Sequence, residues 1–209
     1  VEPAEQKSLW NWIFYSNLPF FALGVILFWS RPSILLSFLA FFFFAGQYSS
    51  TPIRAKAKPL IDSLFSGLHY VATGVFAFAL LSGMLPPLSL IIAGLAWTTA
   101  MHVYSAIPDI KADTDAGLQT LAMILGSRST VFLCVGMYTL AAYLVLPYFG
   151  LLSVLLLIPY LYLMWQSLKS ISKENIVDES ALFKIYKKFP LLNTIVGMAL
   201  FFLTYFYQT

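Results

Sequence analysis

No charged side chain occurs in the stretch Thr130-Val-Phe-Leu-Cys-Val-Gly-Met-Tyr-Thr-Leu-Ala-Ala-Tyr-Leu-Val-Leu146. It follows Arg128 and ends at Pro147, so the apolar run has a charged start and a helix-breaking end. A transmembrane helix needs about 17–25 mostly apolar residues to cross the hydrocarbon core of a bilayer. The stretch therefore predicts a helix that spans a membrane.

Six further segments have a similar length and apolar character, with proline and glycine gathered near their ends. They cover approximately residues 11–29, 32–48, 63–83, 86–104, 149–165 and 190–207. The sequence thus predicts an all-α integral membrane protein, a multi-helix transmembrane bundle with seven helices in this chain.

The composition agrees with a membrane environment. The chain is 60% hydrophobic, 17% aromatic and only 10% charged, whereas a soluble domain is about 25% charged. Its one cysteine, Cys134, excludes an intramolecular disulfide. A net charge of +3 gives no indication of nucleic acid as a partner, so membrane lipid is the partner that we expect from composition.

The basic residues predict the orientation. Of the 12 lysines and arginines, all except Arg31 fall on the side of the membrane that holds the N-terminus. Basic residues are concentrated in cytoplasmic loops. We therefore expect an integral protein of the cell inner membrane whose longer loops, with the active-site residues, face the cytoplasm.

The loop Asp109-Ile-Lys-Ala-Asp113-Thr-Asp115-Ala-Gly117, called the aspartate turn below, holds three of the nine acidic residues. Carboxylates at positions i and i+4 lie on one face of a helical turn, and their oxygens suit Mg²⁺. Asp109 and Asp113 are therefore candidate metal ligands and catalytic residues, with Asp115 as an adjacent candidate. The alternative interpretation is a solvated loop with incidental charge.

Residues 54–58, called the basic turn below, place Arg54, Lys56 and Lys58 between two prolines. Arginine binds phosphate oxygens in a bidentate fork, and lysine adds a point charge. Because the basic turn and the aspartate turn are expected at one membrane face, a diphosphate bridged through Mg²⁺ is a reasonable ligand. The basic turn could instead bind lipid headgroups, or the two turns could form direct salt bridges.

Other polar residues receive structural interpretations. Asp62 is expected to cap the helix that follows it. His102 is assigned to packing, because the second histidine, His69, lies in another helix. Asn17 and Asn193 lie inside apolar segments and are expected to bond to neighbouring helices.

The loop of residues 166–189 mixes apolar residues with lysines. This pattern predicts a linker with a short amphipathic helix on the headgroups, beginning at Asp178 as its N-cap.

Two longer segments contain the two turns. One is Tyr104-Ser-Ala-Ile-Pro-Asp109-Ile-Lys-Ala-Asp113-Thr-Asp-Ala-Gly117-Leu-Gln-Thr120-Leu-Ala-Met-Ile-Leu-Gly126, and the other is Tyr48-Ser-x-x-Pro52-x-Arg54-x-Lys56-x-x-Pro59-x-x-Asp62. The first resembles the second aspartate motif of UbiA-type membrane prenyltransferases, and the second resembles the segment after that family's fourth helix. The order and spacing of the motifs match, and the resemblance covers essentially the whole chain.

The resemblance implies an activity. A prenyl diphosphate would bind through Mg²⁺, ionise to an allylic carbocation, and be attacked by an apolar isoprenoid acceptor inside the bundle. The residues that the resemblance places at this site are Asp109, Asp113 and Asp115 for the metal, and Arg54, Lys56, Tyr48 and Tyr104 for the substrate.

The Ser-Ala-Ile-Pro-Asp variant is most similar to the branch of lycopene elongases/hydratases, which implies a carotenoid acceptor such as lycopene. Quinone, chlorophyll and archaeal-lipid acceptors are the alternatives within the family. A non-catalytic membrane transporter is the alternative of another class, although no charged residue lies deep in a predicted span.

The family also has nine helices and a first motif, Asn-Asp-x-x-Asp-x-x-x-Asp, which nothing in this chain matches. We therefore expect residues 1–209 to form a single transmembrane prenyltransferase domain that is incomplete at its N-terminus, and that would hold half of the metal site.

Overall fold

The computed structural model describes residues 3–115 and 117–207, and the side chains of these residues except 3–7, 10 and 203–207. Its long helices are α1 (Pro3–Phe28), α2 (Pro32–Ser49), α3 (Pro59–Ser82), α4 (Leu88–Ser105), α7 (Ser127–Phe149), α8 (Leu151–Lys169) and α10 (Phe189–Tyr207). Short helical elements occupy the loops, namely η1 (Ala55–Ala57), α5 (Ile110–Asp115), α6 (Leu121–Leu125) and α9 (Glu179–Tyr186). The all-α prediction is confirmed, and each predicted apolar segment corresponds to one long helix.

Six long helices among the described residues have the length and apolar composition to cross a membrane, namely α1, α2, α3, α4, α7 and α8. The seventh predicted segment is helical in α10, whose last side chains lie outside the described residues. The predicted boundaries differ most at α1, which begins at Pro3 and not near residue 11, and α3 also begins earlier than predicted, at Pro59. Proline fits the first turn of a helix because the amide proton that it lacks would have no partner there.

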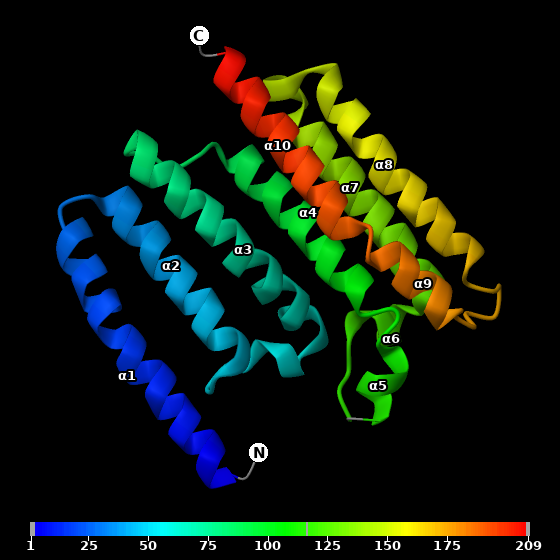
Figure 1. Cartoon of the computed structure of the whole chain (residues 1–209), viewed down its shortest axis with the longest axis horizontal. Helices are drawn as coiled ribbons and strands as arrows, with labels where there is room; N and C mark the ends of the chain where they lie inside the picture. Colours follow the sequence, from blue (N-terminus) through cyan, green and yellow to red (C-terminus); the bar gives the residue numbers. More distant parts are fainter. Residues whose placement is uncertain (1–2, 116, 208–209) are drawn as a thin grey trace.

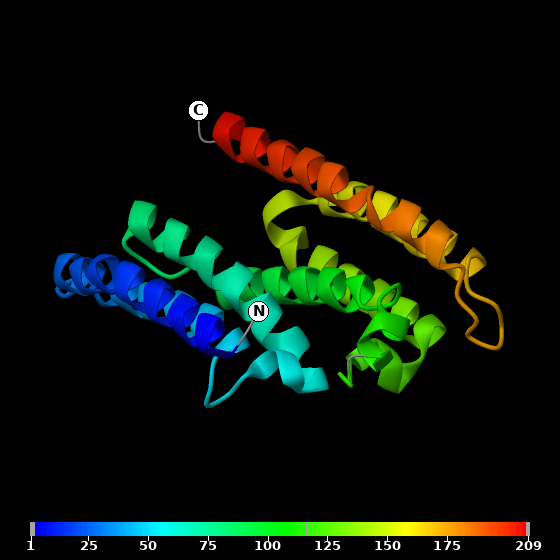
Figure 2. The same ribbon diagram turned by 60° about the horizontal axis from the view of Figure 1, so that its bottom comes forward.

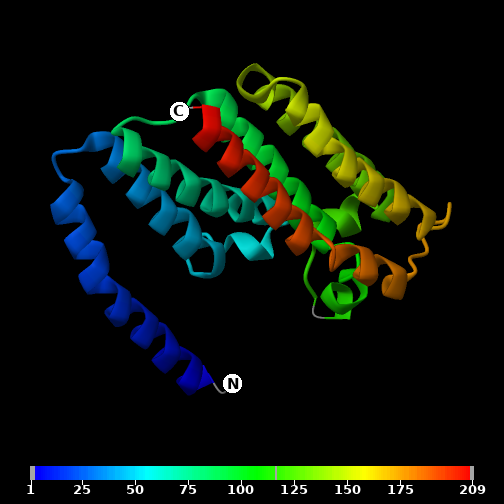
Figure 3. The same cartoon turned by 45° about the horizontal axis from the view of Figure 1, so that its top comes forward.

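Helices α2, α3, α4, α7 and α8 follow one another side by side in chain order (Figures 1 and 2). Helix α1 packs on α2 at one edge, and α10 lies over the α4–α8 part of the bundle (Figure 3). Asn193 of α10 fixes this crossing, because its Oδ1 accepts a hydrogen bond of 2.8 Å from the Tyr160 hydroxyl and its Nδ2 lies 3.0 Å from the Met101 sulfur. The interhelical role predicted for Asn193 is thereby confirmed.

Asn17 was expected to act in the same way, and that prediction is wrong. Its amide donates to the carbonyl of Ile13 in its own helix at 2.8 Å. Asn17 is exposed on α1, where its amide shares the Ile13 carbonyl with the Ser16 hydroxyl of the same helix.

The two parts of the bundle are packed differently. Elements α4 and α7–α10 share a core cluster that includes Tyr104, Tyr138 and Met164, each at most 2% exposed. Helices α1–α3 meet mainly through phenylalanine rings, with Phe38 within 6 Å of Phe21 and Phe76. Edge-on and offset ring pairs contribute about 0.5–1.5 kcal/mol each beyond the area that they bury.

The polar loops lie at one end of the bundle, called the loop end below. This end carries η1, the α5–α6 segment and the loop between α8 and α9 (Figure 1). Asp178 caps α9 as predicted, since its carboxylate accepts a hydrogen bond from the Ala181 amide at 3.0 Å. The basic turn and the aspartate turn therefore share one end of the molecule, and its cytoplasmic location stays a prediction.

Candidate active site

The basic turn leaves α2 through a backbone reversal at Arg54. The amide of Arg54 donates to the carbonyl of Ser50 at 2.8 Å, and Arg54 itself has a φ of 45°, in the left-handed region. Such a conformation costs a non-glycine residue about 1–3 kcal/mol, which the surrounding structure must offset. Ala55 is fully buried beneath the turn. The side chains on either side of Ala55, those of Arg54 and Lys56, are exposed at the loop end.

The aspartate turn is helical, as its spacing predicts. The amide of Asp113 donates to the carbonyl of Asp109 at 2.8 Å, and α5 ends at Asp115, shortly before Gly117, whose φ of 67° favours glycine. Asp109 and Asp115 are exposed, and Asp113 is half-buried. The turn thus presents its first two carboxylates on one helical face.

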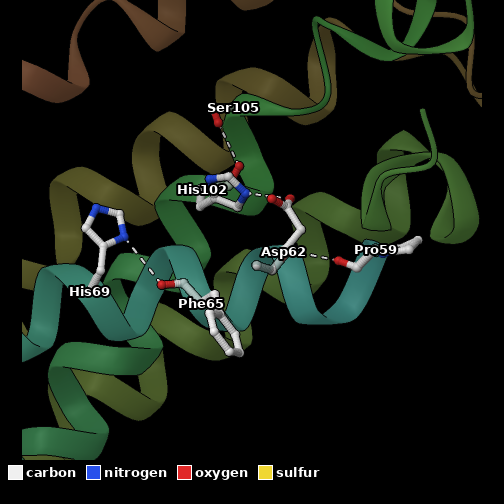
Figure 4. A network of polar contacts seen from close by, with 7 residues as sticks. Pro59, Asp62, Phe65, His69, His102 and Ser105 are labelled. Atoms are coloured by element: carbon white, nitrogen blue, oxygen red, sulfur yellow. Dashed lines mark hydrogen bonds and ion pairs between the residues drawn. The ribbon is translucent and has the colours of Figure 1, made fainter. Parts of the chain in front are cut away.

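Asp62 has a role that the sequence did not indicate. It lies in the first turn of α3, is 8% exposed, and places its carboxylate Oδ2 2.8 Å from His102 Nε2 at the end of α4 (Figure 4). The prediction that Asp62 caps α3 is wrong, because no side chain caps this helix and Lys58 is the N-cap residue. Water has little access to the Asp62 carboxylate, and a buried charge is unfavourable without a partner. The carboxylate therefore points at the imidazole of His102, which supplies that partner.

The Asp62 carboxylate also lies close to the aspartate turn. The pKa of Asp113 is raised above its ordinary value by partial burial, then by the negative charge of Asp109, and then by that of Asp62. The carboxylates of Asp109 and of Asp62, the latter in the first turn of α3, therefore both repel that of Asp113 at the loop end. The basic turn directly precedes the helix that carries Asp62, so side chains of both charges lie at the loop end.

Tyr48 completes this group of side chains from α2. Its ring centroid lies 6.0 Å from that of His69 and 6.4 Å from that of His102. The phenol is also close enough to Asp62 for the two groups to interact electrostatically. The structure thus brings the two histidines to the same tyrosine ring, although the sequence separates them into different helices.

Tyr104 requires a correction. Its side chain is completely buried, its hydroxyl lies 2.7 Å from the Ser167 hydroxyl of α8, and its ring packs 5.0 Å from that of Phe189. An apolar ring at the end of a helix lowers its free energy by burial in the core when a partner for its hydroxyl is present. We therefore assign Tyr104 to the packing of α4 against α8 and α10, and not to the binding of diphosphate.

The two turns are not joined by direct salt bridges. Among the described residues, the ion pair that the structure contains is His102–Asp62. The charges of the basic turn and of the aspartate turn thus remain available to a ligand.

The carboxylates fit a magnesium ion when a substrate supplies further oxygens. Within the described part of the chain, no three His, Cys, Asp or Glu side chains are grouped so that they could hold a metal. Mg²⁺ is, however, commonly bound by one or two carboxylates together with water and substrate phosphate oxygens. The crowding of negative charge that raises the pKa of Asp113 would be relieved by a divalent cation.

An apolar cavity of about 350 Å³ lies deeper in the bundle, between α4, α7, α8 and α10. Its lining includes Trp97, Tyr138, Tyr160, Asn193 and Gly197. Trp97 and His102 are on the same helix, and five residues correspond to a rise of about 7.5 Å. The cavity is thus separated from the loop end by little more than one helical turn of α4.

Comparison with known proteins identifies the family. The model of the UbiA prenyltransferase family matches residues 6–193. The chain belongs to the UbiA prenyltransferase family. The resemblance seen in its two motifs is therefore confirmed, and so is its similarity to the carotenoid branch.

Curated relatives of this UbiA family chain include the lycopene elongase/hydratase of Haloferax volcanii, which is 46% identical over 121 residues, covering 57% of this chain and 40% of the relative. The lycopene elongase/hydratase of Halobacterium salinarum is 40% identical over 162 residues, covering 76% of this chain and 54% of the relative. The chain spans about half the length of the curated relatives it matches.

The fold agrees with that of a solved UbiA homologue from Archaeoglobus fulgidus, described as bound to GPP and Mg²⁺. The TM-score is 0.57 at 18% identity, over 77% of this chain and 59% of the other. At this identity the likeness establishes the fold alone.

Sequence patterns predict both charged turns but not the Asp62–His102 pair. One signal was present, since acidic residues at the edge of a transmembrane helix seldom lack a partner. Nothing in the sequence, however, pairs residue 62 with residue 102.

Proposed function

We propose that the full-length protein transfers a prenyl group from an allylic diphosphate to an apolar acceptor in the membrane, and that this acceptor is a carotenoid such as lycopene. The observation that carries the proposal is that the Asp113 carboxylate lies within electrostatic range of Asp109 and of Asp62, at the same end of the bundle as the exposed basic turn. Membership of the UbiA family and the names of the relatives support the same activity.

The charges at the loop end suit a leaving diphosphate. Arg54 and Lys56 would bind its oxygens, and Asp109 and Asp113, with Asp115 beside them, would hold Mg²⁺. Bound Mg²⁺ would neutralise the negative charge that develops on the departing group. Tyr48 would line the same site from α2, where its phenol interacts electrostatically with Asp62.

The aromatic interior suits the apolar partner. The cavity bordered by Trp97, Tyr138 and Tyr160 offers ring faces, which stabilise a nearby carbocation by cation–π attraction, and walls that exclude water. The names of the relatives combine elongation with hydration. We therefore include the addition of water to the prenylated acceptor in the proposed activity.

The test uses membranes that contain the full-length protein, dimethylallyl diphosphate and lycopene. The expected result is a prenylated carotenoid, detected by mass spectrometry, whose formation requires Mg²⁺ and is lost in Asp109→Ala although the variant is inserted normally. Parallel assays with a quinone and with an archaeal lipid decide the acceptor class. Substrate flux in liposomes without any prenylated product would instead support a transporter.

A further inference from the structure

The Asp62–His102 pair leaves one nitrogen of the imidazole unused. The ring directs Nε2 at Asp62, and the second nitrogen, Nδ1, faces away from that carboxylate (Figure 4). Among the described residues, Nδ1 has no hydrogen-bond partner, because the Ser105 hydroxyl binds the backbone carbonyl of His102 and not its ring. The side chain of His102 is 22% exposed, whereas that of Asp62 is 11% exposed. The histidine therefore has one nitrogen held in place by Asp62 and one without a hydrogen-bond partner among the described residues.

This arrangement sets the chemical state of the free nitrogen. An ionised carboxylate only accepts hydrogen bonds, so the proton of a neutral imidazole resides on Nε2 and Nδ1 carries a lone pair. The carboxylate also stabilises the imidazolium that forms when Nδ1 accepts a proton. Such a pair is a general base whose orientation is fixed by its partner.

The position of the pair matches the place where a proton must leave. Asp62 lies in the first turn of α3 and His102 in the last turn of α4, so both are at the loop end. The proposed acceptor reacts with the carbon that was bonded to the diphosphate, and the acceptor cation forms on the carbon next to the new bond. That cation is therefore created near the diphosphate site and within a short distance of the loop end.

From these observations we infer that His102 is the base that holds and deprotonates the water added to the acceptor, with Asp62 as its positioning residue. The inference rests on the proposed function. A water that donates a hydrogen bond to Nδ1 keeps its oxygen lone pairs free to face the cation.

The reaction balances without an oxidant or a reductant. The carbon–oxygen bond to diphosphate breaks and its electron pair stays with the leaving group. The π electrons of the acceptor alkene form the new carbon–carbon bond and leave a cation on the adjacent carbon. A lone pair of water then forms a carbon–oxygen bond, and one proton of that water moves to Nδ1. If no water is held there, the same cation loses a proton from carbon and gives an alkene.

The surroundings of His102 offer a matched control. His69 also packs against the Tyr48 ring, but its Nδ1 lies 3.3 Å from the carbonyl of Phe65 in its own helix. Asp62 contacts His102 and not His69 among the described interactions. His69→Ala therefore removes a histidine near the same ring without touching the pair.

The experiment measures the ratio of hydroxylated to alkene product in membranes with the full-length protein, supplied with dimethylallyl diphosphate and lycopene in H₂¹⁸O. The wild-type protein is expected to incorporate ¹⁸O. His102→Ala should lower the ratio by about tenfold or more, since a general base contributes roughly 10²–10⁴. Asp62→Asn should lower it by a smaller factor, and His69→Ala should leave it unchanged. Added imidazole should restore hydroxylation in His102→Ala.

The outcomes separate this inference from the proposed function. Absence of any prenylated product from the wild-type protein would remove the proposed function itself. Prenylated product without ¹⁸O in the wild-type protein, or an unchanged ratio in both His102→Ala and Asp62→Asn, would overturn the inference alone. Equal loss of both products in these variants, with no recovery in imidazole, would mean that the pair only joins α3 to α4, and would also overturn it.

Discussion

The loop end and the interior cavity differ in every property that matters for ligand binding. At the loop end, Arg54, Lys56, Asp109 and Asp115 are exposed, and the carboxylates repel one another. In the cavity, the walls are apolar and aromatic, and the amide of Asn193 is bonded to Tyr160. The exposed charges of the two turns, which form no ion pairs among the described residues, suit a charged headgroup with its metal, and an apolar cavity suits a hydrocarbon. The proposed function uses this difference, because it assigns the diphosphate to the loop end and the apolar acceptor to the cavity.

Asp113→Asn is expected to have the largest effect. Loss of one metal-binding carboxylate should lower prenyl transfer by about 10³-fold, because metal stabilisation of the leaving group is worth several kcal/mol. The assay is product formation at saturating substrate and varied Mg²⁺. Glu174→Gln, an exposed acid in the α8–α9 loop, is the control and should retain the wild-type rate. Full activity of Asp113→Asn would contradict the assignment.

The same substitution has a predictable effect on stability. The pKa of Asp113 is raised in the folded protein, so the folded state favours the protonated form and is penalised when pH rises through the ordinary range of an aspartate. Asparagine mimics the neutral form. Thermal unfolding in detergent at neutral pH and without Mg²⁺ should therefore show Asp113→Asn to be at least as stable as the wild-type protein. Clear destabilisation would show that the carboxylate is needed for folding.

Arg54→Ala should have the next largest effect and should act on the diphosphate. A charge-assisted hydrogen bond is worth about 1.5–3 kcal/mol, so we expect KM for the prenyl diphosphate to rise by roughly 10- to 100-fold, with a smaller change in kcat. Arg31→Ala, at the opposite end of the bundle, is the control. An equal rise of KM in both variants would indicate a general electrostatic effect and not a binding contact.

Gly197→Leu tests the cavity. A side chain at Gly197 would meet no atom within 4 Å at its Cβ and would extend from α10 into the lining. Transfer to lycopene should fall by about tenfold, as is typical when a few methylene groups alter an apolar pocket, while diphosphate binding is unchanged. Gly136→Leu is the matched control, because Gly136 is equally unobstructed but lies outside the cavity. A similar loss in both variants would remove the cavity from the proposal.

Tyr104→Phe should have the smallest effect and should change stability alone. It deletes the hydroxyl that bonds Ser167 in the core, at a cost of about 1 kcal/mol. Unfolding measurements should detect a modest loss, and KM for the prenyl diphosphate should be unchanged. A rise in KM would show that Tyr104 contributes to diphosphate binding, and would contradict its assignment to the packed core.

The features that the sequence predicted correctly depend on local patterns. Apolar runs of sufficient length located the long helices, and the spacing of Asp109 and Asp113 predicted their helical turn. The cap at Asp178 followed from a similarly short-range rule. Asn17 and Tyr104 were interpreted wrongly because their surroundings depend on which helices pack beside them. An asparagine on an exposed face bonds to its own helix, and a tyrosine beneath α10 becomes part of the core.

The sequence by itself determined that this protein is a helical membrane protein with a basic turn and an aspartate turn at one face, because hydrophobic length and charge placement act within single segments. Only the tertiary structure decided that Asp62 meets His102, 40 residues away, that His102 lies beside the Tyr48 ring, and that an apolar cavity lies between α4, α7, α8 and α10. These contacts arise from the packing of α2, α3 and α4 against one another. The relative rotation of packed helices depends on all the side chains at their interfaces and is not encoded in any one segment.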